Sequence, residues 1–136
     1  MILQSDKEME YVLRNAKTIA IIGASQNPLR DSTMVMHYLL QNGFDVIPVN
    51  PKYDEVFGKK CYPTVSDIGK MVDVVDVFRR GEFVDEVAKD AVSAKANVLW
   101  MQLGITNEAA AQYAHDHGMK VVMNRCIMVE HRKLIR

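Results

Sequence analysis

The sequence contains little cysteine, no excess of charge of either sign and no long apolar run. Two cysteines are too few for a disulfide framework or a cysteine-based metal site. The 17 basic and 17 acidic side chains balance, whereas nucleic-acid binding usually requires a basic excess. Strictly apolar runs, as at residues 19–22, are far shorter than the roughly 20 residues that span a bilayer. With no secretory signal visible, we expect a protein of the reducing cytoplasm without a nucleic-acid or membrane partner.

The length and composition are typical of one folded domain. A chain of 136 residues with 49% hydrophobic and 25% charged residues fits a compact domain of ordinary size. We therefore predict a single domain over residues 1–136, without room for a separate catalytic domain. Nine methionines are consistent with adaptable packing or with a contact in a homo-oligomer.

Short segments rich in Val and Ile alternate with segments of helical spacing. Such strands are expected when helices cover both faces of a parallel sheet. The strand candidates are residues 18–22, 45–49, 73–78, 97–102 and 120–123. Apolar residues recur at helical spacing in the segments 9–16, 34–39, 83–91 and 109–114. The alternation predicts a Rossmann-like, three-layer α/β domain with a five-stranded, mainly parallel sheet and helices on both faces.

The first predicted strand ends in a turn of small residues that suits an anionic ligand. Gly23-Ala24-Ser25 is followed by Arg30, Ser32 and a helix, so backbone N–H groups, hydroxyls and a guanidinium can face a phosphate. The turn is not G-x-G-x-x-G, because Ser25 occupies the second glycine position. A plain tight turn with a surface arginine is the alternative, and the position after the first strand favours phosphate binding.

The second and third strand ends carry cations and no carboxylate directly after the strand. Binders of NAD usually have an acidic residue after the second strand for the ribose hydroxyls, but here Asn50 and Lys52 follow. These side chains tolerate or attract a ribose phosphate, which NADP and coenzyme A both carry. After the third strand, Phe78 can stack on an adenine or cover the core, and Arg79 faces either solvent or an anion.

The last two strand ends offer small and reactive groups. Gly104 permits a close backbone approach, and Asn124 can orient a ligand amide. Cys126 precedes a further helix, which can lower the pKa of a thiol and make it reactive. A small buried thiol is the favoured interpretation of Cys126. No metal-ligand motif is present, and nothing identifies a general base.

Together these motifs resemble the small, single-domain CoA-binding proteins. That family looks like the N-terminal domain of the succinyl-CoA synthetase α subunit standing alone. The resemblance extends from about residue 12 to residue 134 and rests on the segments 23–32, 46–51, 58–63, 74–79, 100–105 and 124–126. Because the phosphohistidine domain and the ATP-grasp partner of the synthetase are not encoded in this chain, the resemblance supports binding more than ligation.

The resemblance implies that coenzyme A or an acyl-CoA lies at the carboxyl edge of the sheet. The first turn would meet the diphosphate, the second strand end would lie at the adenosine, and the last strand ends would line the path to the thiol. The implied binding residues are Gly23, Ala24, Ser25, Arg30, Ser32, Asn50, Lys52, Val77, Phe78, Arg79, Gly104, Asn124, Arg125 and Cys126.

Catalysis at the same edge is the alternative to a binding module. A small NADP-dependent oxidoreductase or an acyl-transfer enzyme would use Cys126 or Ser25 as its nucleophile. Ser25 lacks the G-x-S-x-G context of a nucleophile elbow, which counts against this alternative. If Cys126 lies near the pantetheine thiol, oxidised coenzyme A could form a mixed disulfide with it.

Overall fold

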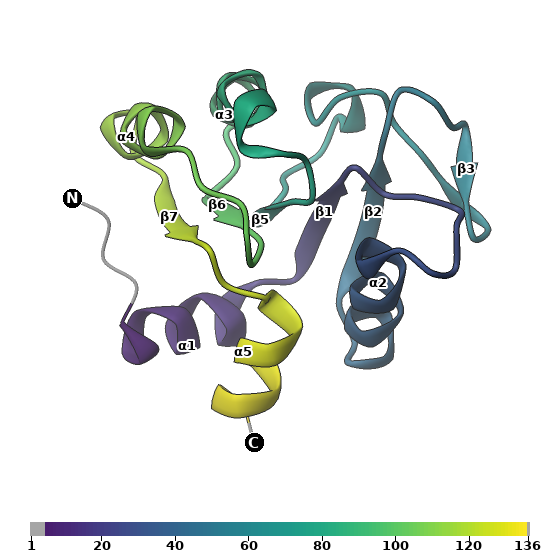
Figure 1. The fold of residues 1–136 in the computed structure, drawn as a ribbon, viewed down its shortest axis with the longest axis horizontal. Helices are drawn as coiled ribbons and strands as arrows, with labels where there is room; N and C mark the ends of the chain where they lie inside the picture. The colour runs from purple at the N-terminus through teal and green to yellow at the C-terminus, as the bar shows by residue number, and fades with distance from the viewer. Residues whose placement is uncertain (1–4, 136) are drawn as a thin grey trace.

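A computed structural model describes residues 5–135 and has a sheet of five parallel strands at its centre (Figure 1). The sheet order is β2-β1-β5-β6-β7. The strands are β1 (Thr18–Ile22), β2 (Asp45–Val49), β5 (Val74–Val77), β6 (Val98–Met101) and β7 (Lys120–Met123). The predicted fold class is confirmed. Because β2 and β5 flank β1 on opposite sides, the strand order changes direction there, which is where open α/β sheets bind ligands.

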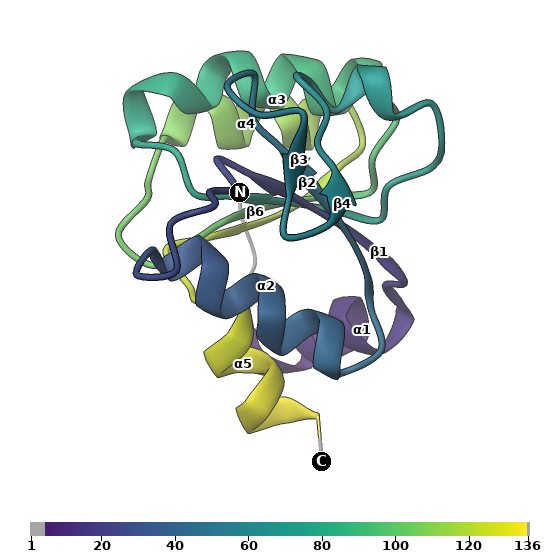
Figure 2. The same cartoon turned by 90° about the vertical axis from the view of Figure 1, so that its right-hand side faces the viewer.

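Helices cover both faces of this sheet (Figure 2). On one face lie α1 (Asp6–Asn15), α2 (Asp31–Gln41) and α5 (Ile127–Leu134). On the other lie α3 (Val84–Ser93) and α4 (Glu108–Asp116). No helix in the described part of the chain is long and apolar enough to cross a membrane.

The helices form because each has an apolar stripe that packs on the sheet. In α3, Val87, Ala88 and Ala91 are buried, as their spacing predicts. In α2 the stripe differs from the prediction, because Met34 is exposed while Val35 is buried. Met34 therefore does not contribute to the core, although its spacing suggested that it would.

A small hairpin not predicted from the sequence follows β2. Its strands, β3 (Glu55–Val56) and β4 (Lys59–Lys60), pair antiparallel. Phe57 and Gly58 join them with φ of 47° and 80°, the left-handed conformation that two-residue hairpin turns require. Two short 3₁₀ helices, η1 (Ser66–Ile68) and η2 (Gly81–Phe83), complete the connections.

One carboxyl group lies inside the sheet layer. Asp76 of β5 is fully buried between Ile21 and Trp100 of the neighbouring strands. Neither of its carboxylate oxygens has a hydrogen-bond partner. Burial raises the pKa of this carboxyl well above its ordinary value, so the group favours its protonated form in the folded chain.

Candidate functional site

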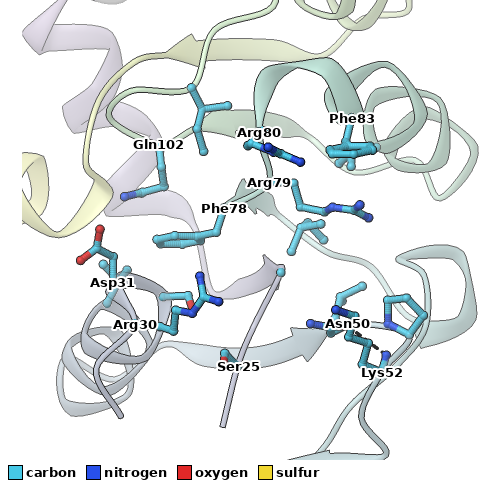
Figure 3. A pocket seen from close by; sticks show the side chains of 18 of the residues that line it. Ser25, Arg30, Asp31, Asn50, Lys52, Phe78, Arg79, Arg80, Phe83 and Gln102 are labelled. Carbon is cyan, nitrogen blue, oxygen red and sulfur yellow. Dashed lines mark hydrogen bonds between the residues drawn. The ribbon is translucent and has the colours of Figure 1, made fainter. Parts of the chain in front are cut away.

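A cleft of about 1150 Å³ opens at the carboxyl edge of the sheet (Figure 3). Its walls come from the segments that follow β1, β2, β5 and β6 and from the first turns of α2 and α5. Part of α3 completes the lining. The cleft therefore lies at the edge where the sequence predicts the site.

The turn after β1 requires a glycine at its first position. Gly23 has φ of 88°, and its N–H donates to the Val49 carbonyl at 2.9 Å. A Cβ there would lie 3.3 Å from Cγ of Arg79 and 3.4 Å from the carbonyl oxygen of Phe78. The missing side chain thus allows the first and third strand ends to approach each other.

The N-terminus of α2 presents hydrogen-bond donors without acceptors. Arg30 occupies the N-cap position, and its side chain does not cap the helix. The N–H groups of Asp31 and Ser32 donate to no acceptor within residues 5–135. Ser32 is only 5% exposed, lines the cleft, and its hydroxyl has no partner in that range. Such a helix end attracts an anion.

Asn50 connects two of the loops that form the cleft. Its Nδ2 donates to the carbonyl of Ala24 at 2.9 Å, and its Oδ1 accepts from the backbone N–H of Lys52 at 2.9 Å. The amide is therefore engaged in shaping the turn. The neighbouring Lys52 is exposed and lines the cleft, so its ammonium group is available to a ligand phosphate.

The segment after β5 adds two guanidinium groups. Arg79 lies over the ring of Phe83 with 4.5 Å between Cζ and the ring centroid, an arrangement that stabilises a cation. Arg80 lies 5.6 Å from the same ring and forms an exposed ion pair with Glu82 at 3.3 Å. Both arginines line the cleft (Figure 3).

Three carboxylates also line the cleft: Asp31, Glu86 and Asp90. Asp90 accepts hydrogen bonds from the backbone N–H of Val65 at 2.7 Å and from the Ser66 hydroxyl at 2.6 Å, so its charge is partly satisfied within the fold. The carboxylates therefore balance only part of the positive charge of the four cleft-lining cations, which are Arg30, Lys52, Arg79 and Arg80. The remaining positive charge suits a ligand with several phosphates.

The loops after β6 and β7 are joined to each other. The N–H of Gly104 donates to Oδ1 of Asn124 at 2.7 Å, and the Arg125 guanidinium donates to the Asn124 carbonyl at 3.1 Å. Gln102 accepts the first N–H of α5, from Ile127, at 3.0 Å. These bonds hold the start of α5 against the end of β6.

Nine of the fourteen predicted binding residues line the cleft: Gly23, Ser25, Arg30, Ser32, Asn50, Lys52, Phe78, Arg79 and Cys126. The other five lie outside its lining: Ala24, Val77, Gly104, Asn124 and Arg125. Ala24 and Val77 are buried in the core, so their side chains are not accessible to a ligand. The roles of all fourteen as ligand contacts stay predictions.

Residues 17–132 match the model of the CoA binding domain family. The chain belongs to this family. The resemblance drawn from the sequence motifs is therefore confirmed, and it covers nearly all of the described residues.

Relatives of this CoA binding domain include both small proteins and ligases. The uncharacterized protein YneT of Bacillus subtilis is 39% identical over 127 residues, covering 93% of this chain and 94% of YneT. A solved structure of a hypothetical protein from Pyrococcus horikoshii is 43% identical, with a TM-score of 0.95 over 98% of this chain and 94% of that one. An ADP-forming acetate–CoA ligase of Archaeoglobus fulgidus is 31% identical over 117 residues, or 77% of this chain and 17% of the ligase.

Several cleft residues of this CoA binding domain were not predicted as ligand contacts. Gln102 and Leu103 follow β6 in a segment that the strand-end rule indicates, but only the neighbouring Gly104 was selected. Met34, Met128 and Val129 lie on helices, where the same rule gives no signal. Their positions depend on how α2 and α5 pack, which helical periodicity alone does not determine. Within residues 5–135, no group of three or more potential metal-ligating side chains is found.

Proposed function

We propose that this protein binds coenzyme A or an acyl-CoA in the cleft and catalyses no reaction of its own. The observation that carries the proposal is the open N-terminus of α2 in a cleft that four cations also line. Coenzyme A carries a diphosphate and a ribose phosphate, and both need cationic or N–H donors. Membership of the CoA binding domain family supports this ligand.

The donors are distributed along the cleft in a way that suits these two phosphate groups. The diphosphate would lie at the α2 N-terminus, near Arg30 and Ser32. The ribose phosphate would lie near Lys52, which follows β2. Phe78 and the stacked pair of Arg79 and Phe83 would border the adenine or the pantetheine arm.

The candidate nucleophiles lack the surroundings that catalysis needs. The Ser25 hydroxyl accepts the N–H of Asn27 at 3.0 Å, which fixes it as part of a turn. Cys126 lines the cleft, but none of the four histidines does so within the described chain. A nucleophile without a positioned base is weakly activated, which favours a carrier, sensor or regulator over an enzyme. The two free thiols support a reducing compartment, so we propose the cytoplasm.

Calorimetric titration with coenzyme A, dephospho-CoA, NADP and NAD tests the ligand. Coenzyme A should bind more tightly than the other three. Binding of NADP in the micromolar range without binding of coenzyme A would overturn the proposal and favour the oxidoreductase alternative. Turnover of a thioester or of NADPH that disappears in Cys126→Ala would overturn the absence of catalysis.

Substitutions test the placement of the two phosphate groups. Lys52→Ala should weaken coenzyme A binding about fivefold, because one charge-assisted contact is lost, but should not weaken dephospho-CoA. Arg30→Ala should weaken both ligands. Lys89→Ala removes an exposed lysine of α3 that does not line the cleft, and should leave both affinities unchanged. Equal losses for the two ligands in Lys52→Ala would contradict the assignment of the ribose phosphate.

A further inference from the structure

One end of the cleft is apolar and exposed. Met34 is 55% exposed, Leu103 68% and Val129 47%, and Met128 is half-buried. All four line the same cleft as the cations. We call these four residues the apolar end. Exposed large apolar side chains gathered in one place usually mark a binding site.

Contacts between α2 and α5 bring the helical members of the apolar end together. The Tyr38 hydroxyl of α2 lies 2.7 Å from Nδ1 of His131 of α5. Met34 lies one turn before Tyr38 on the same face of α2, and Met128 lies one turn before His131 on α5. The Tyr38–His131 contact thus aligns the faces that carry the two methionines.

The end of β6 joins the same group. Gln102 accepts the N–H of Ile127, the residue before Met128, and Leu103 directly follows Gln102. Figure 3 shows Asp31 of α2 and Gln102 on one side of Phe78, while Asn50 and Lys52 lie on the other. The apolar end therefore belongs to the side of the cleft away from Lys52.

We propose that the ligand is an acyl-CoA whose acyl group is aliphatic and uncharged, and that this group packs against the apolar end. This inference rests on the proposed function, with the ribose phosphate near Lys52. With its diphosphate at the α2 N-terminus, such a ligand would continue away from Lys52. Its thioester would then lie near Cys126, which lines the same cleft, and its acyl chain would lie on the apolar end. Methionine side chains adapt to chains of different length.

The apolar character of this end selects the kind of acyl group. A carboxylate on the acyl group would lose hydration against the methionines. A straight aliphatic chain does not meet this penalty, and each methylene that it buries raises the affinity by up to about fourfold.

Titration of the full chain with a series of thioesters tests the inference. Affinity should rise from acetyl-CoA through butyryl-CoA to hexanoyl-CoA, by about two- to fourfold per methylene. Butyryl-CoA should bind at least tenfold more tightly than succinyl-CoA, which has the same number of acyl carbons. A flat series, or equal affinity for these two four-carbon ligands, would overturn the inference while leaving coenzyme A binding intact. Failure of coenzyme A itself to bind would instead overturn the proposed function.

A matched pair of variants locates the effect. Met34→Gln should reduce the ratio of hexanoyl-CoA to coenzyme A affinity about threefold or more. Met71→Gln should leave this ratio unchanged, because Met71 is 58% exposed but does not line the cleft. If a second copy of the chain covers the apolar end instead, Met34→Gln will shift the oligomeric state in sedimentation and the thioester series will be flat. That outcome would refute the acyl assignment.

Discussion

Replacing Asp76 by asparagine should stabilise the fold increasingly as the pH rises. The Asp76 carboxyl is fully buried and has no hydrogen-bond partner, and burial raises its pKa well above the ordinary value. In the unfolded chain the same carboxyl titrates near pH 4. Between that pH and the raised pKa of the folded state, the folded chain holds a proton that the unfolded chain has released, so the free energy of unfolding falls as pH rises.

The size of this effect follows from the single proton by which the folded and unfolded states differ. While the folded carboxyl stays protonated and the unfolded one is ionised, stability falls by about 1.4 kcal/mol per pH unit. The amide introduced by Asp76→Asn would not titrate and has nearly the same volume as the carboxyl. The variant should therefore gain about 1.3 kcal/mol on the natural protein between pH 5 and pH 6. This is about a tenth to a quarter of the roughly 5–15 kcal/mol by which domains are usually stable.

Urea unfolding followed by circular dichroism at pH 5 and pH 6 measures this difference. Comparing two proteins at each pH cancels the contributions of all other titrating groups. Asp85→Asn, at an exposed position of α3, is the control and should show no such growth with pH. Parallel stability curves for Asp76→Asn and the natural protein would refute the argument, because they would mean that the folded carboxyl ionises normally.

Three further predictions concern other parts of the fold. Gly81→Ala should lower the free energy of unfolding by at least about 1 kcal/mol, because a Cβ at this position would collide with the backbone carbonyl of Thr106 in the loop before α4. Urea unfolding measures this loss, and an unchanged free energy of unfolding would contradict the prediction. Treatment with CoA disulfide should add coenzyme A to Cys126, whose thiolate displaces one CoA thiolate. Cys61 should not react, because it is buried and burial raises the pKa of its thiol. Mass spectrometry that finds the adduct only on Cys61 would exclude the placement of Cys126 near the ligand thiol. Burial lowers the pKa of His131, so the free energy of unfolding should fall as the pH drops below about 6.5. If a His131→Gln variant loses the same free energy over this pH range, His131 is not the cause.

Much of the fold could be predicted because its signals are local. The strands are short Val- and Ile-rich runs, and the bounds of β1, β2 and β7 agree with the sequence prediction. Asn107 is of a residue type that favours helix N-caps, and its side chain accepts the N–H of Ala110 at the start of α4 at 2.9 Å. The β3–β4 hairpin was not predicted, because its strands have two residues each and Phe57 is an unusual residue for a left-handed turn.

The cleft could be predicted only in part, because its walls depend on long-range contacts. Parallel strands end at one edge, so the residues after β1 and β2 could be placed there from sequence order. Whether a loop residue faces the cleft is decided by bonds such as the one between Gly104 and Asn124. The apolar end depends on the contact between Tyr38 and His131, which lie 93 positions apart, and no local pattern reveals it.

The position of Trp100 allows its intrinsic fluorescence to report ligand binding. It is the only tryptophan in the sequence, is fully buried, and pairs in register with Asp76. Its indole Nε1 donates to the carbonyl of Arg125 at 2.8 Å, one residue before Cys126. Emission from this indole should therefore be blue-shifted in the folded chain and should change when a ligand displaces the segment that carries Cys126, without any attached dye.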